Sequence, residues 1–225
     1  MKANIRLVAS ACIKFLVGIV LVGLLVFLPA GTVVYPNGWL FMAVLFVPML
    51  IVGVVMALCS PRLLKKRLNS KEKEAEQRSV VASSGIMFIA AFVVAGFNYR
   101  YSWIVMPSWA VWGAVLLFLL SYLMYAEVMR ENAYMSRTIE VQEGQKVIDT
   151  GLYGIVRHPM YTSTIILFLS MPLVLGSFPS FVIMLVYIPL IVKRIKNEER
   201  VLLNGLDGYV AYCRKVKYRL LPFVW

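Results

Sequence analysis

Long hydrophobic segments separated by short polar stretches run through the whole sequence of 225 residues. The first four of these segments have the length of about 20 residues that an α-helix needs to cross the hydrocarbon core of a bilayer. They predict membrane helices at about residues 5–28, 39–59, 79–98 and 107–126. The pattern therefore predicts an all-α integral membrane protein.

Two shorter hydrophobic segments, at about residues 160–175 and 178–192, follow a polar stretch at residues 127–157. The Gly-Ser-Phe-Pro sequence at residues 176–179 predicts a tight turn, so the two segments form a helical hairpin. Sixteen helical residues rise about 24 Å, which is less than the roughly 30 Å of the hydrocarbon core. We therefore expect about six transmembrane helices, or five and a re-entrant element, with the second arm continuing as helix to about Leu203.

Charged residues predict the orientation of these helices. Six crossings place 22 of the 23 Lys and Arg residues and all 11 acidic residues on one side, and only Arg100 on the other. The positive-inside rule makes the basic side, with both termini, cytoplasmic. Lys65, Lys66 and Arg67 form a basic block on this side that can contact anionic lipid headgroups.

Composition supports a membrane protein and excludes other classes. Hydrophobic residues make up 61% of the chain, whereas soluble domains are usually nearer half. The net charge of +12 comes without a nucleic-acid-binding motif, so we expect no nucleic-acid partner. The three cysteines are far apart and form no metal-binding pair, so no metal site is predicted. We divide the chain into an N-terminal four-helix region (1–130) and a C-terminal region (131–225).

Polar side chains that could bind a ligand or take part in a reaction lie just before the hairpin. Gly151 and Tyr153 precede the sequence Arg-His-Pro-Met-Tyr at residues 157–161. Proline suits the first position of a helix, which makes His158 the cap residue. The N–H groups at such a helix start attract anions, although the same residues can also form a purely structural cap.

A second polar cluster follows the hairpin. Arg194 and Glu198 are four residues apart and so share one face of a helix, and Glu199 comes next. Two adjacent acids there can bind a cationic or hydroxyl-rich ligand, or can simply be a solvated, salt-bridged helix end. The hairpin brings both clusters together, so a site between them would touch water and the membrane interface.

The two clusters together carry a resemblance to a known family. The order is Gly-x-Tyr-x-x-x-Arg-His-Pro-x-Tyr, a hydrophobic hairpin, Arg-x-x-x-Glu-Glu-x-x-Leu, then Tyr-x-x-Tyr and Leu-Pro-Phe. Over about residues 137–225 this order resembles the isoprenylcysteine carboxyl methyltransferase family and its phospholipid methyltransferase relatives. The resemblance implies S-adenosyl-L-methionine as methyl donor, bound without a Rossmann domain. The sequence agrees, since it has no GxGxxG after a strand.

The resemblance also implies roles for individual residues. Arg194 would face the substrate as a catalytic residue, and Glu199 or His158 would act as general base toward an amine nucleophile. The stretch at residues 145–148 departs from the family in its side chains, so its contacts would be mainly through the backbone. The residues implied to bind the cofactor are Gln145, Lys146, Val147, Ile148, Tyr153, His158, Pro159, Met160, Tyr161 and Glu198.

Four functions remain open at this point. Carboxyl O-methylation of an isoprenylcysteine-type lipid substrate is favoured, with the site on the cytoplasmic side. The first alternative is N-methylation of a phospholipid or an amine. A sterol-type membrane reductase that uses NADPH is a further alternative, because such enzymes share an Arg-His-Pro-x-Tyr-like segment. The last is a membrane protein without enzymatic activity.

Overall fold

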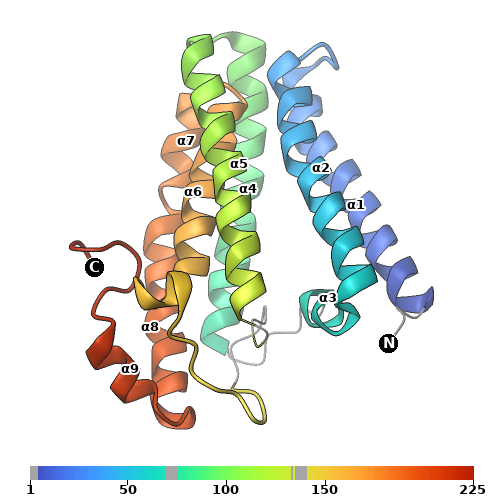
Figure 1. Ribbon diagram of the computed structural model, residues 1–225. Coiled ribbons are helices and arrows are strands. Elements are labelled where there is room, and N and C mark those ends of the chain that lie inside the picture. Colours follow the sequence, from blue (N-terminus) through green and yellow to red (C-terminus); the bar gives the residue numbers. More distant parts are fainter. Residues whose placement is uncertain (1–4, 69–74, 133, 135–140) are drawn as a thin grey trace.

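The computed structural model describes residues 5–68, 75–132, 134 and 141–225, and all regular elements in these ranges are helical (Figure 1). The all-α prediction is therefore confirmed. The first part of the chain forms α1 (Ile5–Ala30), α2 (Pro36–Cys59), α3 (Pro61–Leu68), α4 (Ala75–Tyr101) and α5 (Ser108–Glu131).

The second part of the chain contains the hairpin and the polar segments that flank it. Its elements are the 3₁₀ turn η1 (Gly151–Gly154), α6 (Pro159–Val174), α7 (Phe178–Met184), α8 (Tyr187–Gly205) and α9 (Tyr209–Lys215). The turn between α6 and α7 lies where the sequence predicts it, with Gly176 at a φ of 73° and Ser177 capping α7. The end of α8 at Gly205 also confirms the predicted continuation of helix beyond the hydrophobic segment.

The second arm of the hairpin is not the single helix that the sequence predicts. It consists of α7 and α8, which are separated at Leu185 and Val186. Pro189 explains the interruption, because it has no N–H to donate to the carbonyl of Leu185 and its ring collides with that carbonyl in a regular helix.

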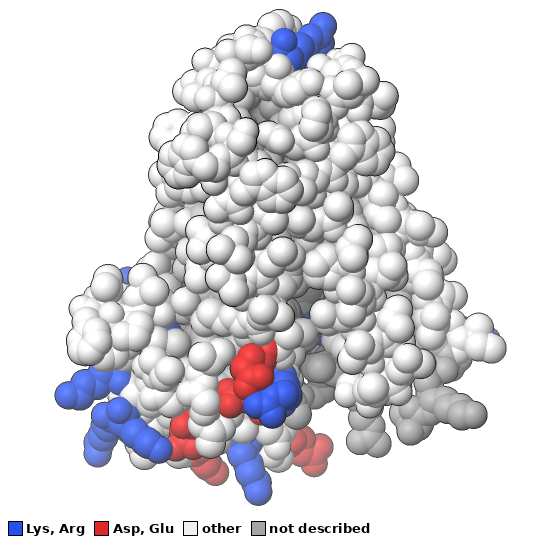
Figure 2. All heavy atoms as spheres, turned by 45° about the horizontal axis from the view of Figure 1, so that its top comes forward, with Lys and Arg blue, Asp and Glu red and all other residues white. Residues whose placement is uncertain are grey.

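Among the residues that the structure describes, five segments are long and hydrophobic enough to cross a membrane when α7 and α8 are taken together as residues 178–205, and α6 is shorter, with 16 residues. This agrees with the expected five helices and one shorter element. Charged side chains gather at one end of the bundle, which we call the foot, below an uncharged middle (Figure 2). Arg100 lies at the last turn of α4, at the opposite end.

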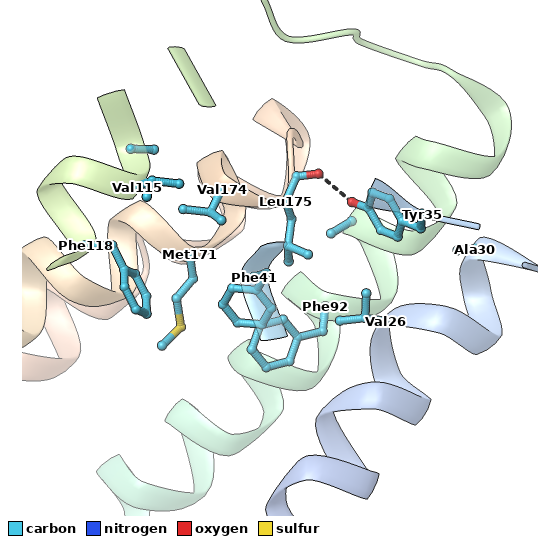
Figure 3. Packing of buried hydrophobic residues seen from close by; sticks show 12 residues of the cluster. Val26, Ala30, Tyr35, Phe41, Phe92, Val115, Phe118, Met171, Val174 and Leu175 are labelled. Atoms are coloured by element: carbon cyan, nitrogen blue, oxygen red, sulfur yellow. Dashed lines mark hydrogen bonds between the residues drawn. The ribbon is translucent and has the colours of Figure 1, made fainter. Parts of the chain in front are cut away.

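A hydrophobic core at the end opposite the foot joins the two parts of the chain. Phe41 of α2 and Phe118 of α5 are fully buried there and face Met171 of α6 (Figure 3). The hydroxyl group of Tyr35 donates a hydrogen bond to the carbonyl of Leu175 in the same core. This core therefore fixes the N-terminal hairpin of α1 and α2 against the helix that begins at the polar segments.

The short helix α3 lies at the foot (Figure 1). The Nζ atom of Lys14 in α1 donates to the carbonyl of Leu68, the last residue of α3, at 2.7 Å. Leu64 of α3 is buried and Lys65 is exposed, which makes α3 a surface helix. The Lys66 side chain and residues 69–74 lie outside the described part of the chain.

The backbones of α1 and α4 approach most closely at Gly96. A Cβ atom on this residue would lie 2.7 Å from the carbonyl oxygen of Val26 and 2.8 Å from Cβ of Pro29. Both distances are too short for a side chain, so the crossing of α1 and α4 depends on a glycine at this position.

We predict that Gly96→Ala lowers the stability of the protein by about 1–3 kcal/mol, because the added methyl group overpacks the crossing. Gly85→Ala in the same helix is the control, since no atom lies within 4 Å of its Cβ position. Thermal unfolding in detergent, followed by circular dichroism, gives the two midpoints. Equal midpoints for both variants would contradict the close crossing.

Candidate active site

The start of α6 is held by the C-terminal tail. The backbone N–H groups of Arg157 and His158 donate to the carbonyls of Tyr218 and Arg219, both at 2.9 Å. Pro159 is the first residue of α6 and His158 is its cap residue, as predicted from the sequence. The hydroxyl of Thr162 donates to the carbonyl of Leu220 at 2.8 Å, so the tail is attached on both sides of this helix start.

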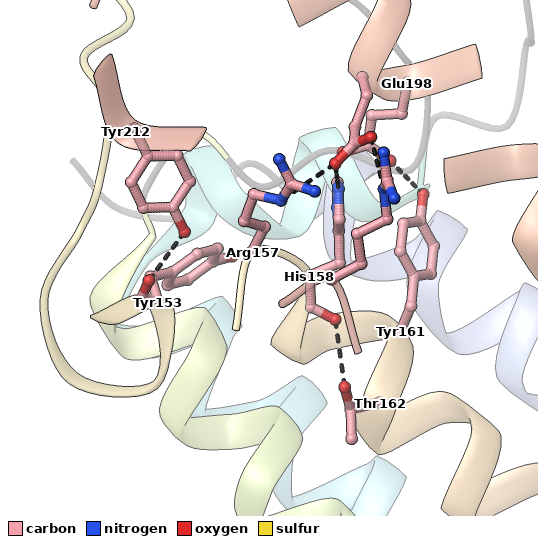
Figure 4. A network of polar contacts seen from close by, with 9 residues as sticks. Tyr153, Arg157, His158, Tyr161, Thr162, Glu198 and Tyr212 are labelled. Atoms are coloured by element: carbon pink, nitrogen blue, oxygen red, sulfur yellow. Dashed lines mark hydrogen bonds and ion pairs between the residues drawn. The ribbon is translucent and has the colours of Figure 1, made fainter. Parts of the chain in front are cut away.

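Glu199 is the centre of a buried network of charges. Figure 4 shows Arg157 and His158 of this network beside Tyr161. Its Oε2 atom accepts a hydrogen bond from Nε of Arg219 at 2.7 Å. Its Oε1 atom lies 3.2 Å from Nε of Arg157 and 3.3 Å from Nε2 of His158. The residue is only 6% exposed. A carboxylate this buried is stable when cations and hydrogen bonds satisfy both oxygens, and here they do.

The neighbouring acid, Glu198, joins the two arms of the hairpin. It accepts a hydrogen bond from the hydroxyl of Tyr161 in α6. The same hydroxyl accepts one from Nε of Arg194 in α8 at 3.0 Å. The two polar clusters of the sequence therefore meet at the foot of the hairpin, as their spacing predicts.

A cavity opens at this meeting point. Its volume is about 110 Å³. Pro159 and Glu199 do not line it: Pro159 is fully buried at the helix start, and Glu199 lies in the network described above. The implied site residues that do line it are Gln145, Lys146, Val147, Ile148, Tyr153, His158, Met160, Tyr161, Arg194 and Glu198.

Seven further residues line the cavity without having been assigned to a site from the sequence. They are Asn132, Tyr134, Arg157, Leu202, Leu206, Tyr209 and Tyr212. The Tyr-x-x-Tyr spacing of the last two was a signal for part of this set, because it places both on one face of α9. Asn132 and Tyr134 reach the cavity because of the path that the chain takes after the end of α5. No sequence pattern indicates that path.

Three tyrosines build the wall between η1 and α9. The hydroxyl of Tyr212 donates to the carbonyl of Tyr153 at 2.8 Å, and the hydroxyl of Tyr153 accepts from Nδ2 of Asn132 at 2.9 Å. Burial raises the pKa of Tyr153 to about 12, against the opposing effects of the Asn132 hydrogen bond and the positive charge of Arg67. Tyr209 is 4% exposed, and its hydroxyl has no hydrogen-bond partner in the described protein.

The loop before η1 forms another wall. The side-chain carbonyl of Gln145 accepts from the backbone N–H of Gln142 at 2.9 Å, which closes a small turn. Asp149 accepts from Nζ of Lys215 in α9 at 2.6 Å, and this hydrogen bond lowers the pKa of Asp149. The loop is thus attached to α9 across the cavity.

Gly151 fixes the position of η1 against the end of α5. Its φ is +50°, and a Cβ atom there would lie 1.7 Å from Oε1 of Glu131. The other oxygen of Glu131 accepts from the backbone N–H of Leu152 at 3.3 Å. The backbone angle therefore favours glycine, and a side chain here would have to displace the carboxylate of Glu131.

The chemistry of the lining suits an organic ligand with polar groups. Glu198 offers an acceptor for an ammonium or hydroxyl group, and the orphaned hydroxyl of Tyr209 has capacity for a ligand atom, because buried polar groups in native proteins are nearly always paired. Among the described residues, no group of three or more His, Cys, Asp or Glu side chains can hold a metal ion.

The fold is that of an all-helical membrane protein, and the cavity at the charged end of its bundle is a candidate small-molecule site. Residues 113–204 match the model of the Isoprenylcysteine carboxyl methyltransferase (ICMT) family, which confirms the resemblance and supports a membrane methyltransferase. The match begins inside α5, earlier than the sequence motifs suggest, and ends before α9.

One curated relative is a Delta(14)-sterol reductase from Mus musculus. It is 31% identical over 91 residues, which are 39% of this chain and 22% of the reductase. The chain therefore spans about a fifth of the length of that relative.

We predict that Glu199→Ala lowers the stability by about 3–5 kcal/mol, because it leaves Arg157 and His158 buried without their acidic partner. Asp149→Ala is the matched control: it removes an exposed ion pair, and exposed pairs contribute little. Thermal unfolding of the two variants in the same detergent measures the difference. A Glu199→Ala protein as stable as the control would contradict the structural role of this network.

Proposed function

We propose that the protein is an S-adenosyl-L-methionine-dependent membrane methyltransferase whose substrate is lipid-like, with carboxyl O-methylation of an isoprenylcysteine-type substrate favoured. The family match supports methyl transfer. The observation that carries the proposal is the cavity where Tyr161 and Glu198 meet, lined by ten of the residues that the resemblance implies. It lies at the foot, beside the start of the 16-residue hydrophobic helix α6, where a lipid headgroup and a water-soluble cofactor can both reach it.

The lining fits the proposed cofactor group by group. Glu198 would accept hydrogen bonds from the ammonium or ribose of S-adenosyl-L-methionine, and Tyr209 would supply a hydroxyl. His158, at the start of α6, would receive the carboxylate. The hydrophobic side chains of Leu202 and Leu206 would cover the adenine. When bound, the cofactor supplies a methyl group already activated by a sulfonium sulfur.

The surroundings of Glu199 favour an oxygen nucleophile over an amine. A carboxylate substrate needs no general base, whereas an amine must lose a proton. The two residues considered as bases, Glu199 and His158, are bound to each other, and Glu199 is also bound to Arg157 and Arg219. We therefore assign Glu199 a positioning role, holding His158 against the cavity, in place of proton transfer.

The charge distribution supports a cytoplasmic site. The foot carries the cavity and the basic segments, and Arg100 lies at the other end of the bundle. By the positive-inside rule the foot faces the cytoplasm, and a multi-pass protein in this orientation would meet S-adenosyl-L-methionine from the cytosol.

We expect Glu198→Ala and His158→Ala to weaken the binding of S-adenosyl-L-methionine about tenfold or more, because each removes a charged or polar contact from the cavity. Isothermal titration calorimetry on protein in detergent measures the affinity. Lys193→Ala is the control, since this exposed residue lies next to Arg194 outside the cavity lining. Normal binding by both site variants would falsify the assignment of the cofactor site.

Transfer of a tritiated methyl group to lipid extracts and prenylcysteine analogues tests the reaction itself. A base-labile product identifies a methyl ester and supports O-methylation, whereas a base-stable product identifies an N-methylated amine. Because the chain is similar to a sterol reductase, the binding of NADPH is measured as well. Binding of NADPH without binding of S-adenosyl-L-methionine would overturn methyl transfer in favour of reduction.

Arg194→Ala should lower turnover and leave the affinity for S-adenosyl-L-methionine unchanged. The hydrogen bond from its Nε atom to Tyr161 holds the guanidinium group at the cavity, where it can orient a substrate carboxylate or phosphate. Steady-state kinetics and calorimetry separate the two effects. A parallel loss of turnover and cofactor affinity would place Arg194 in the cofactor site.

A further inference from the structure

A second arginine at the foot lies in an unusual environment. Arg67 belongs to the short surface helix α3, yet its guanidinium group turns inward and stacks over the ring of Tyr125 in α5, 5.2 Å from the ring centre. Its Nε and Nη2 atoms are buried and have no hydrogen-bond partner in the described protein. Lys65, two residues earlier on the same helix, is exposed.

Two buried guanidinium nitrogen atoms without hydrogen-bond partners are costly, although Arg67 as a residue is only partly buried. Removing its N–H groups from water without replacing their hydrogen bonds carries a free-energy penalty that one cation–π contact offsets only in part. Buried arginines are therefore normally paired with a carboxylate or a phosphate. The unpaired Nε and Nη2 atoms of Arg67 can therefore bind an anion that none of the described residues supplies.

The position of Arg67 relates it to the proposed site. Tyr125, beneath its guanidinium group, packs in one cluster with Tyr153 and Met160, and both of these line the cavity. The charge of Arg67 also acts on the hydroxyl of Tyr153, where it favours the ionised form. Arg67 therefore lies next to the cavity wall formed by η1 and the end of α5.

Arg194 approaches the cavity from another element. It belongs to α8 and binds the Tyr161 hydroxyl, whereas Arg67 comes from α3 and stacks on α5. We propose that Arg67 is a second cationic ligand, which together with Arg194 binds the anionic headgroup of the lipid substrate. This inference rests on the proposed function and deepens it, because it names the substrate's headgroup as an anion, a carboxylate or a phosphate.

The proposal also gives the N-terminal region a part in substrate selection. Helix α3 lies outside residues 113–204, the segment that matches the family model. Arg67 is then a specificity-determining residue that the matched segment does not contain. Planar guanidinium groups bind carboxylates and phosphates through paired hydrogen bonds, so a neutral headgroup of the same shape would be disfavoured.

Equilibrium binding to the full chain in detergent tests the proposal without requiring turnover. The probes are an N-acetylated S-farnesylcysteine, which is a carboxylate, and its neutral primary amide. The wild-type protein should bind the carboxylate about tenfold more tightly than the amide. Arg67→Ala should remove most of this preference by weakening the carboxylate alone, and Arg67→Lys, which keeps the charge, should retain part of it.

Lys65→Ala on the exposed side of α3 is the matched control and should bind both probes as the wild type does. A lysophospholipid probe with a phosphate headgroup distinguishes the source of the anion, since an Arg67-dependent preference for it would identify phosphate. An unchanged carboxylate preference in Arg67→Ala, or an equal loss of both probes, would overturn the proposal. So would a wild-type protein that binds all three probes equally.

Calorimetry with S-adenosyl-L-methionine separates this inference from the proposed function. If the wild-type protein prefers the anion through Arg67 but does not bind S-adenosyl-L-methionine, the role of Arg67 is supported and the proposed methyl transfer is contradicted. If every variant binds S-adenosyl-L-methionine normally and the preference for the anion does not depend on Arg67, the proposed function is supported and the role of Arg67 is contradicted.

Discussion

The candidate site depends on the pairing of one buried carboxylate with the groups around it. Glu199 binds Arg157 and His158 from the start of α6 and Arg219 from the tail, so it holds together three segments that are distant in sequence. It fixes the end of α8 against the segment before α6. Because the ion pairs are buried, they are also shielded from salt and water, which gives the cavity a defined shape before any ligand arrives.

Much of the fold follows from hydropathy alone, because a helix that crosses a bilayer must bury its backbone hydrogen bonds and expose hydrophobic side chains along its whole length. This is why the long helices extend only a few residues beyond the predicted segments. The bend before Pro189 is a local effect that the proline explains once the neighbouring carbonyl is considered. The division of the chain at about residue 130 stays a prediction, although α5 and α6 pack against each other across it.

Helical spacing predicts the part of the candidate site that lies on the hairpin, whereas the loop residues 145–148 were implied only by the family resemblance. Tyr161, Arg194 and Glu198 share the foot because the hairpin returns to the side on which it starts. Asn132 and Arg67 reach the cavity or its wall through turns and a surface helix, and no periodic pattern encodes such paths. Pro159 was implied as a cofactor-binding residue because it belongs to the Arg-His-Pro-Met-Tyr sequence. It is instead the first residue of α6 and does not line the cavity.

The hydrogen bond from Lys14 to the end of α3 has a consequence for how the lipid environment acts on the protein. Lys14 is a charged group within a hydrophobic helix, so its amine settles at the depth where the bilayer meets water. A bilayer of different hydrophobic thickness tilts or shifts such a helix. Since the amine is bound to the carbonyl of Leu68, a change in thickness would displace α3 and its arginine, and under the proposed role of Arg67 it would couple substrate binding to the composition of the membrane.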